Sequence, residues 1–176
     1  MSMLSEIGNL YALDGLVALV TGGAEGMGRE TCLFLAAAGA LVAVADINLP
    51  WAEETAATIT EGGGKARAYQ VDVSQEGSVI DLIQSVRQDH GRLDVLVNVA
   101  GLQDREVLEE TSVELGDKLH HVNLRGPFLT IREAAKKEIG EGRRLALRGR
   151  QAVLEWIAHQ VAALHRQLIG CHRITL

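Results

Sequence analysis

Residues 16–28 read LVALVTGGAEGMG, and the prediction of the fold starts from them. A run of five apolar residues, 16–20, ends at Thr21, and four glycines follow within seven residues, before a helix-like segment over 29–38. Glycines allow a tight turn and let the backbone approach a pyrophosphate, which then lies at the positive end of the helix. The pattern predicts the strand, turn and helix of a dinucleotide-binding unit, although a glycine-rich loop alone also fits an ordinary strand-to-helix turn.

Length and composition indicate a one-domain globular protein. The chain has 176 residues, of which 47% are hydrophobic and 23% charged. Its net charge of −6 argues against nucleic acid and anionic membranes as partners. Two cysteines, Cys32 and Cys171, indicate no disulfide framework and a reducing compartment, and Cys32 is expected to be buried in the first helix. A signal-peptide pattern and an apolar stretch of the ~18 residues that a membrane helix needs are both absent, so we expect a cytoplasmic protein.

Strand-like and helix-like segments alternate along the chain. Strands are predicted over 16–20, 41–45, 66–71 and 93–97, and helices over 26–38, 51–61, 74–90 and 111–139. Pro50 is expected just before the second helix, Ser74 is the predicted N-cap of the third, and Thr111 with Glu114 forms a capping-box pattern for the fourth. Four successive βα units predict an α/β fold with a Rossmann-like, doubly wound parallel sheet.

Two aspartates follow predicted strands. Asp46 closes the second strand, 18 residues after Gly28, where a carboxylate accepts hydrogen bonds from both ribose hydroxyls of an adenosine. A 2′-phosphate there would meet the charges of Asp46 and of Glu25 in the glycine-rich loop, so the sequence predicts NAD rather than NADP. The alternative for Asp46 is that it caps a loop. The second aspartate, Asp72, follows the third strand, and it fits an ordinary acidic residue at a helix N-terminus as well as a binding residue.

Up to about Thr130, four motifs resemble those of the short-chain dehydrogenase/reductase family. They are T-G-x-x-x-G-x-G at 21–28, D-V at 72–73, N-V-A-G at 98–101 and H-V-N-L-R-G-P-F at 121–128. The resemblance implies that Asp72 binds adenine, that the 98–101 turn backs the cofactor, and that Asn123 holds a water of the proton relay. The implied NAD site consists of Gly22, Glu25, Gly26, Met27, Gly28, Asp46, Ile47, Asp72, Val73, Asn98, Ala100, Gly101 and Val122.

The last predicted helix contains two further signals. Gly126-Pro127 inside an otherwise helical pattern predicts a local break near Asn123. His120 and His121 are adjacent, so on a helix they project about 100° apart and do not form a metal pair. No metal site is expected.

The resemblance fails where the catalytic centre of the family belongs. That centre uses a serine and a tyrosine that is followed four positions later by a lysine, which lowers the pKa of the tyrosine. The two tyrosines of this chain, Tyr11 and Tyr69, have no lysine at that spacing; the last serine is Ser112 and the last lysine Lys137. We therefore expect the serine, tyrosine and lysine to be absent, with Asn123 as a catalytic remnant only.

The last part of the chain departs from the family. Residues 147–154 align with the tyrosine-to-lysine stretch, with Leu147 and Gln151 at the two catalytic places. Residues 145–147 are a strand remnant, and 151–168 an amphipathic helix. We expect a single NAD-binding domain over 1–176, family-like over 1–140, with a divergent tail over 141–176 and a sheet incomplete after its fourth or fifth strand. Either the chain is a member truncated or internally deleted by splicing or frame change, or the tail is unrelated to the family.

The resulting hypothesis is an NAD(H)-binding oxidoreductase-like protein. Its parent family acts on alcohols or carbonyl compounds, and this chain is expected to be inactive as it stands; the sequence does not indicate a substrate. The alternatives are a non-catalytic NAD-binding or subunit-interaction module and an unstable fragment. In the family, the helices that correspond to 112–139 and 151–168 pack against a neighbouring subunit. A homo-oligomer, or a hetero-oligomer with intact relatives, is therefore expected.

Overall fold

The computed structural model describes residues 12–103 and 111–140. Residues 1–135 form one compact unit and 136–176 a second, of which only the end of one helix is described. The elements are β1 (Val17–Thr21), α2 (Gly26–Ala37), β2 (Leu41–Asp46), α3 (Leu49–Glu61), β3 (Lys65–Gln70), α4 (Glu76–His90), β4 (Val95–Asn98), α5 (Val113–His120), the π-helical turn η2 (His121–Arg125) and α6 (Gly126–Gly140).

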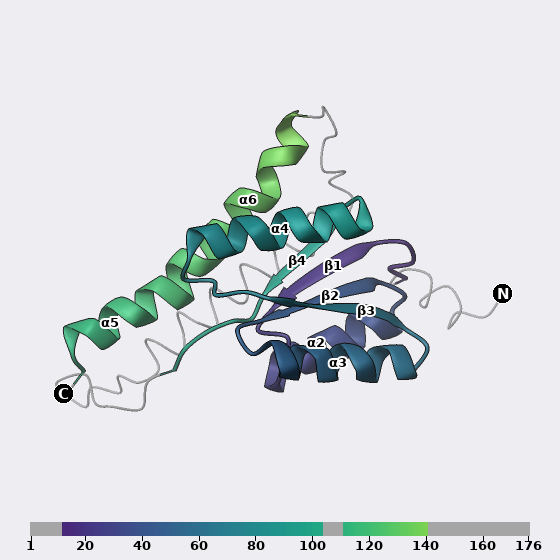
Figure 1. The fold of residues 1–176 in the computed structure, drawn as a ribbon, viewed down its shortest axis with the longest axis horizontal. Coiled ribbons are helices and arrows are strands. Elements are labelled where there is room, and N and C mark those ends of the chain that lie inside the picture. The colour runs from purple at the N-terminus through teal and green to yellow at the C-terminus, as the bar shows by residue number, and fades with distance from the viewer. Residues whose placement is uncertain (1–11, 104–110, 141–176) are drawn as a thin grey trace, which may run out of the picture. The chain divides into compact units, whose positions relative to one another are not determined.

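The four strands form one parallel sheet in the order β3-β2-β1-β4 (Figure 1). Val17 pairs with Leu41 of β2, and Ala18 pairs with Val95 of β4. The chain runs outward from β1 to β3 and then returns to the other side of β1. The predicted α/β, Rossmann-like sheet is confirmed, and its topological switch point lies between β1 and β4, where such sheets bind ligands at their carboxyl ends.

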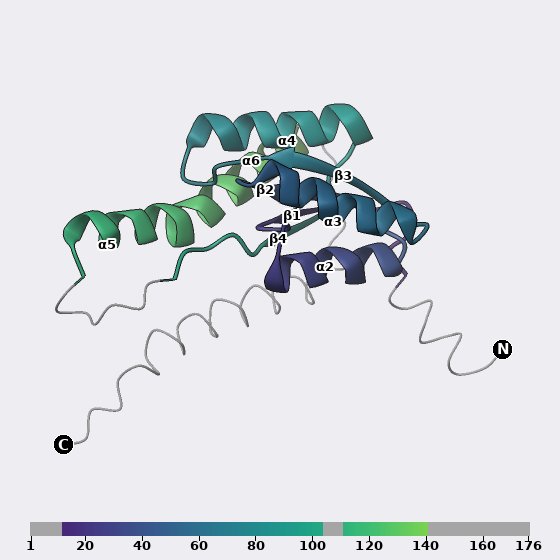
Figure 2. The ribbon, with the colours of Figure 1, turned by 60° about the horizontal axis from the view of Figure 1, so that its bottom comes forward.

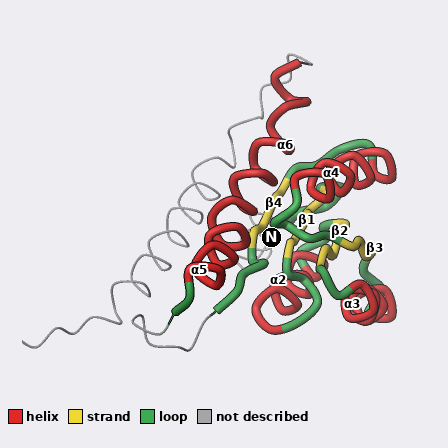
Figure 3. Tube along the Cα trace, turned by 60° about the vertical axis from the view of Figure 1, so that its left-hand side comes forward, coloured by secondary structure: helices red, strands yellow, loops and turns green. Residues whose placement is uncertain are grey.

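Helices cover both faces of the sheet (Figures 2 and 3). Every residue of β1 is buried, as expected for a parallel strand covered on both sides. Alternate residues of the strand therefore pack in two different cores. Leu19 packs in the core that contains Ile83 of α4 and Leu129 of α6. Val20 packs in the core that contains Cys32 of α2 and Ile59 of α3. In the described part of the chain, no helix is long and apolar enough to cross a membrane.

The structure corrects the predicted N-cap of α4. Ser74 does not cap this helix, which begins at Glu76 after an N-cap at Gln75. The backbone N–H and the hydroxyl of Ser74 both donate to Oδ1 of Asp72, at 2.9 and 2.7 Å. Ser74 therefore belongs to a side-chain turn that Asp72 organises, two residues before the helix begins.

Two other predicted helix starts are also corrected. The N-cap of α5 is Ser112, whose Oγ accepts from the N–H of Leu115 at 3.1 Å. The predicted capping box, which began at Thr111, is therefore wrong by one residue. Helix α3 begins at Leu49, and Pro50 lies in its first turn, where its missing N–H costs no helical hydrogen bond. The ends of the strands differ from prediction by one or two residues. The predicted strand over 145–147 and helix over 151–168 lie outside the described residues.

Candidate functional site

The glycine-rich loop after β1 packs on the turn that follows β4. Gly22 has a φ of 72°, and a Cβ there would lie 2.5 Å from the backbone nitrogen of Ala100. A Cβ at Gly28 would lie 1.8 Å from the carbonyl oxygen of Gly22. The N–H of Ala100 donates to the carbonyl of Thr21 at 2.9 Å. Glycine is therefore required at both positions, because a side chain at 22 would push the loop away from the turn after β4, and one at 28 would push α2 away from the loop.

The N-terminus of α2 lies at the end of the same loop. No side chain caps this helix, its N-cap Glu25 is exposed, and its first turn contains no acidic residue. Gly26 has a φ of 51°, and a Cβ there would meet nothing within 4 Å. The positive end of the helix dipole thus lies beside open space at the carboxyl end of the sheet, which suits a phosphate group.

Asp46 at the end of β2 is bound to the glycine-rich loop. Its Oδ2 accepts from the N–H of Ala24 at 3.1 Å, and its Oδ1 accepts from the N–H of Asn48 at 3.0 Å. Asp46 therefore holds this loop, and its binding of a ribose stays a prediction. Each carboxylate oxygen keeps a further lone pair, so the same group is also able to accept a ribose hydroxyl. Ile47, the next residue, is exposed.

The loop after β3 places Asp72 and Val73. Asp72 accepts from Ser74, and its own N–H donates to the hydroxyl of Ser78 at 3.0 Å, so its carboxylate organises the loop. Val73 is buried, and a Cβ at Gly126 would lie 3.0 Å from its Cγ2. The loop of the predicted adenine-binding pair therefore packs directly on the start of α6.

Asn98 joins three elements at the switch point. Its Oδ1 accepts from the hydroxyl of Thr21 in β1 at 3.3 Å and from the hydroxyl of Thr130 in α6 at 2.8 Å. Thr130 is completely buried. Sequence reasoning missed Thr130, because a lone threonine in a helical pattern gives no sign of a contact 32 residues away.

Asn123 lies in η2, and the predicted local break of the helix is confirmed as this π-helical turn. The Nδ2 of Asn123 donates to the carbonyl of Leu102 at 2.8 Å, and its Oδ1 accepts from the N–H of Leu102 at 2.7 Å. Val122 beside it is partly buried and packs, with Ala100, against the core on the α4 side. Asn123 therefore links the helix to the segment that leaves the 98–101 turn.

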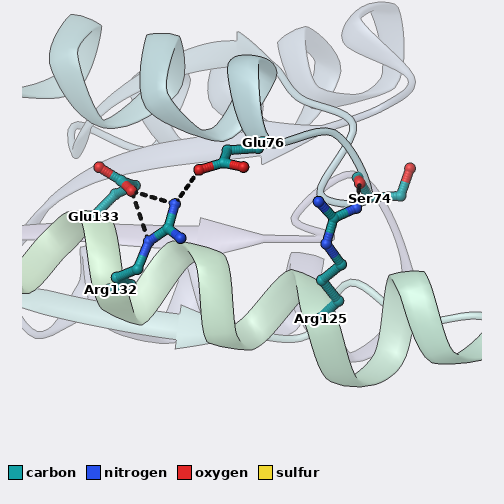
Figure 4. A network of polar contacts seen from close by, with 5 residues as sticks. All are labelled: Ser74, Glu76, Arg125, Arg132 and Glu133. Carbon is teal, nitrogen blue, oxygen red and sulfur yellow. Dashed lines mark hydrogen bonds and ion pairs between the residues drawn. The ribbon is translucent and has the colours of Figure 1, made fainter.

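Arginines hold η2 and α6 against the chain that follows β3 (Figure 4). Arg125 donates to the carbonyl of Ser74 at 3.3 Å, and Arg132 pairs with both Glu76 and Glu133. Arg87 of α4 also donates to α6, at the backbone carbonyls of Glu133 and Ala134. These contacts connect the loop of Asp72 and Val73 to the turn that contains Asn123.

Tyr69 is the tyrosine of the described part, and it lies away from Asn123. It belongs to β3, at the sheet edge opposite β4. Its hydroxyl donates to Oδ2 of Asp89 at 2.8 Å and lies 2.8 Å from Nε2 of His90. Burial, reinforced by the hydrogen bond to Asp89, raises the pKa of Tyr69 above its ordinary value, so this phenol is poorly suited to proton transfer near neutral pH.

Two other expectations concern cysteine and metals. Cys32 is buried as predicted, and burial together with the charge of Asp46 raises the pKa of its thiol to about 12, which excludes an activated nucleophile. Residues 12–103 and 111–140 contain no group of three or more histidine, cysteine, aspartate or glutamate residues that could hold a metal ion. The Nδ1 atoms of His120 and His121 lie beside the carbonyls of Gly116 and Asp117 of α5.

Comparison with known proteins agrees with this arrangement. Residues 16–144 match the family model described as short chain dehydrogenase. The chain is 36% identical over 132 residues to the D-threitol dehydrogenase of Mycolicibacterium smegmatis, covering 75% of this chain and 51% of that protein. It is 38% identical over 116 residues to the cyclopentanol dehydrogenase of Comamonas testosteroni, covering 66% and 46%. The chain thus spans about half the length of the curated relatives it matches.

Solved structures give the same result. The fold is similar to that of a dehydrogenase/reductase from Sinorhizobium meliloti, with a TM-score of 0.72 and 34% identity, over 75% of this chain and 53% of that one. It is also similar to a short-chain type dehydrogenase/reductase from Mycobacterium marinum, with a TM-score of 0.74 and 32% identity, over 81% and 56%. The glycine-rich loop, the switch point and these similarities together show that the chain belongs to the short-chain dehydrogenase/reductase family of oxidoreductases, whose members typically bind NAD(P).

Proposed function

We propose that this chain binds NAD(H) in preference to NADP(H). The observation that carries the proposal is the position of Asp46, whose carboxylate closes β2 and is held beside the glycine-rich loop by the N–H groups of Ala24 and Asn48. A ribose with two free hydroxyls suits this carboxylate. A 2′-phosphate would meet the negative charges of Asp46 and of the exposed Glu25.

The residues present fit a dinucleotide. A side chain at Gly22 or Gly28 would clash with the backbone, and the uncapped N-terminus of α2 suits the pyrophosphate. Asp72 and Val73 would hold the adenine, Ala100 and Gly101 would back the cofactor, and Val122, which packs against the same core as Ala100, would complete the site. When bound, NAD supplies a hydride acceptor.

We further propose that the chain, as it stands, does not oxidise alcohols. A proton donor or acceptor that is correctly placed contributes about 10²–10⁴-fold to such reactions. Tyr69 is engaged with Asp89 and His90, and Asn123 is engaged with Leu102. Neither Tyr11 nor Tyr69 has a lysine four positions later. The residues therefore support cofactor binding and leave the proton transfer without a tyrosine–lysine pair.

The test is calorimetric titration of the whole chain with NAD and with NADP, followed by an assay of NADH formation with a panel of alcohols. We expect stoichiometric NAD binding, weaker NADP binding and no NADH above background. Equal affinity, or a preference for NADP, contradicts the cofactor proposal. Turnover that disappears in Asn123→Ala contradicts the proposed inactivity, because it would show a working relay that includes Asn123.

A second candidate function is that of a subunit-interaction module. Three large apolar side chains follow one side of η2 and α6 at helical spacing: Leu124 is 68% exposed, Phe128 57% and Ile131 45%. Such a row favours burial against a partner, at roughly 1.5–3 kcal/mol for each large side chain. We propose a homo-oligomer or a hetero-oligomer with intact relatives. Light scattering at micromolar concentration tests the homo-oligomer, and co-purification with an intact relative tests the hetero-oligomer; a cooperative monomer that binds no relative contradicts both.

A further inference from the structure

A threonine of α3 holds the glycine-rich loop from outside that loop. The Oγ1 of Thr55 donates to the carbonyl of Ala24 at 3.0 Å, over 31 residues of sequence, and Thr55 is only 1% exposed. The N–H of the same Ala24 donates to Oδ2 of Asp46 at 3.1 Å. Both backbone polar groups of Ala24 are thus bound by side chains, one from α3 and one from the end of β2.

The hydrogen bond of Thr55 differs from those of the other threonines in α2 and α3. A threonine inside a helix commonly donates to a carbonyl three or four residues earlier in the same helix. Thr31, Thr58 and Thr60 do this, with acceptors at Met27, Glu54 and Ala56. The hydroxyl of Thr55 instead leaves its helix and binds the loop. This contact is therefore a specific link between two elements.

The loop has space to move if this link is lost. A hollow of about 250 Å³ lies against it, lined by Ala24, Glu25, Arg29, Trp51, Glu54, Thr55 and Thr58. The loop also contains Gly22, Gly23 and Gly26, which restrict the backbone little. The loop needs fixed contacts to keep one conformation, and Ala24 is bound both by Thr55 and by Asp46.

We propose that Thr55 is a positioning residue for dinucleotide recognition. By holding the carbonyl of Ala24, Thr55 fixes the N–H that binds Oδ2 of Asp46, and so fixes the orientation of the carboxylate that selects NAD over NADP. The inference rests on the proposed NAD-binding function and extends it to a residue that has no place in the family motifs quoted above. Loss of the hydroxyl should weaken NAD binding and reduce the discrimination against NADP together.

The test compares Thr55→Val, which removes the hydroxyl and keeps the branched shape, with Thr55→Ser, which keeps the hydroxyl. Thr58→Val is the matched control, because Thr58 lies one turn later in α3, is exposed and binds only its own helix among the contacts described. Calorimetry with NAD and NADP should give about tenfold weaker NAD binding for Thr55→Val, the effect of one lost buried hydrogen bond. The affinity for NADP should fall less, so the ratio of NAD affinity to NADP affinity should decrease. Thr55→Ser and Thr58→Val should keep both affinities within about twofold.

The outcomes separate the inference from the function on which it rests. If the unaltered chain does not bind NAD, the proposed function fails and the inference fails with it. If the unaltered chain binds NAD and Thr55→Val keeps the same ratio of NAD to NADP affinity, only the inference fails, even when the melting temperature falls. If Thr55→Val does not fold, Thr55→Ala and Thr55→Ser replace it as the pair that differs in the hydroxyl. An unchanged affinity ratio between those two overturns the inference as well.

Discussion

The buried hydroxyl of Thr130 donates a hydrogen bond of 2.8 Å to the side-chain oxygen of Asn98. Thr21 donates to the same oxygen at 3.3 Å. One amide oxygen therefore holds β1, β4 and α6 together at the switch point of the sheet. Because these hydrogen bonds join elements that surround the candidate site, their loss should lower the stability of the fold.

Thr130→Val should lower the free energy of unfolding by about 1–3 kcal/mol, since it removes a buried donor from Asn98. The loss of unfolding free energy should lie near the lower end of this range, because Thr21 still donates to Asn98. Urea denaturation followed by circular dichroism measures it. Thr58→Val is the control and should stay within about 0.5 kcal/mol of the unaltered chain. A Thr130→Val variant as stable as that control would show that the hydrogen bond contributes nothing.

Asp46→Ala should reduce the difference between the binding free energies of NAD and NADP by roughly 1–3 kcal/mol, the range for the loss of a charged hydrogen-bond partner. Calorimetric titration with both dinucleotides checks it. Asp81→Ala, at an exposed position of α4, is the control for removal of one negative charge. Because Asp46 also binds Ala24 and Asn48, circular dichroism should accompany the titration. A preference that stays the same in a folded Asp46→Ala variant would exclude Asp46 as its source.

Gly28→Ala and Gly77→Ala should have opposite effects on stability. A Cβ at Gly28 would lie 1.8 Å from the carbonyl oxygen of Gly22, so the loop must shift, and we expect a loss of about 3 kcal/mol or more. A Cβ at Gly77, in the first turn of α4, would meet nothing within 4 Å, and alanine there should raise stability by about 0.5–1 kcal/mol. Thermal unfolding of the two variants compares them directly. Equal melting temperatures for the two variants would contradict the close approach of position 28 to the carbonyl oxygen of Gly22.

His90 should make folding sensitive to mild acid. Burial lowers its pKa below the ordinary 6.5; the charge of Asp89 opposes this shift, and that of Arg67 adds to it. Because the pKa is lower in the folded state, the stability that neutral His90 contributes is present above about pH 6.5. This contribution is lost as the pH falls through the folded-state value.

The loss of unfolding free energy between neutral pH and mild acid should be smaller in His90→Gln than in the unaltered chain. Urea denaturation at several pH values measures this difference. His120→Gln, at an exposed position of α5, is the control for the substitution itself. Identical pH profiles for His90→Gln and the unaltered chain would refute the contribution of His90.

Local patterns were enough to predict the order of the strands and the local features on which the candidate site is built. The apolar run before Thr21 predicted β1, and the glycines after it predicted the tight turn and the uncapped start of α2. Asp46 was predicted at the end of β2 because the apolar run stops there. These features depend on residues that are neighbours in the sequence, and hydrophobic period and backbone freedom act over such short distances.

Contacts between distant segments were not predictable in the same way. Nothing near Thr55 or Thr130 in the sequence indicates that their hydroxyls bind Ala24 and Asn98. Which hydroxyl finds which acceptor depends on how helices pack on the sheet, over 31 and 32 residues of chain for these two threonines. The amino-acid pattern alone therefore implies a parallel α/β fold with an acidic strand end beside a glycine-rich loop. The links that hold this loop and the switch point in place arise only from tertiary packing, because a buried hydroxyl must bind whichever acceptor the packed elements bring within reach.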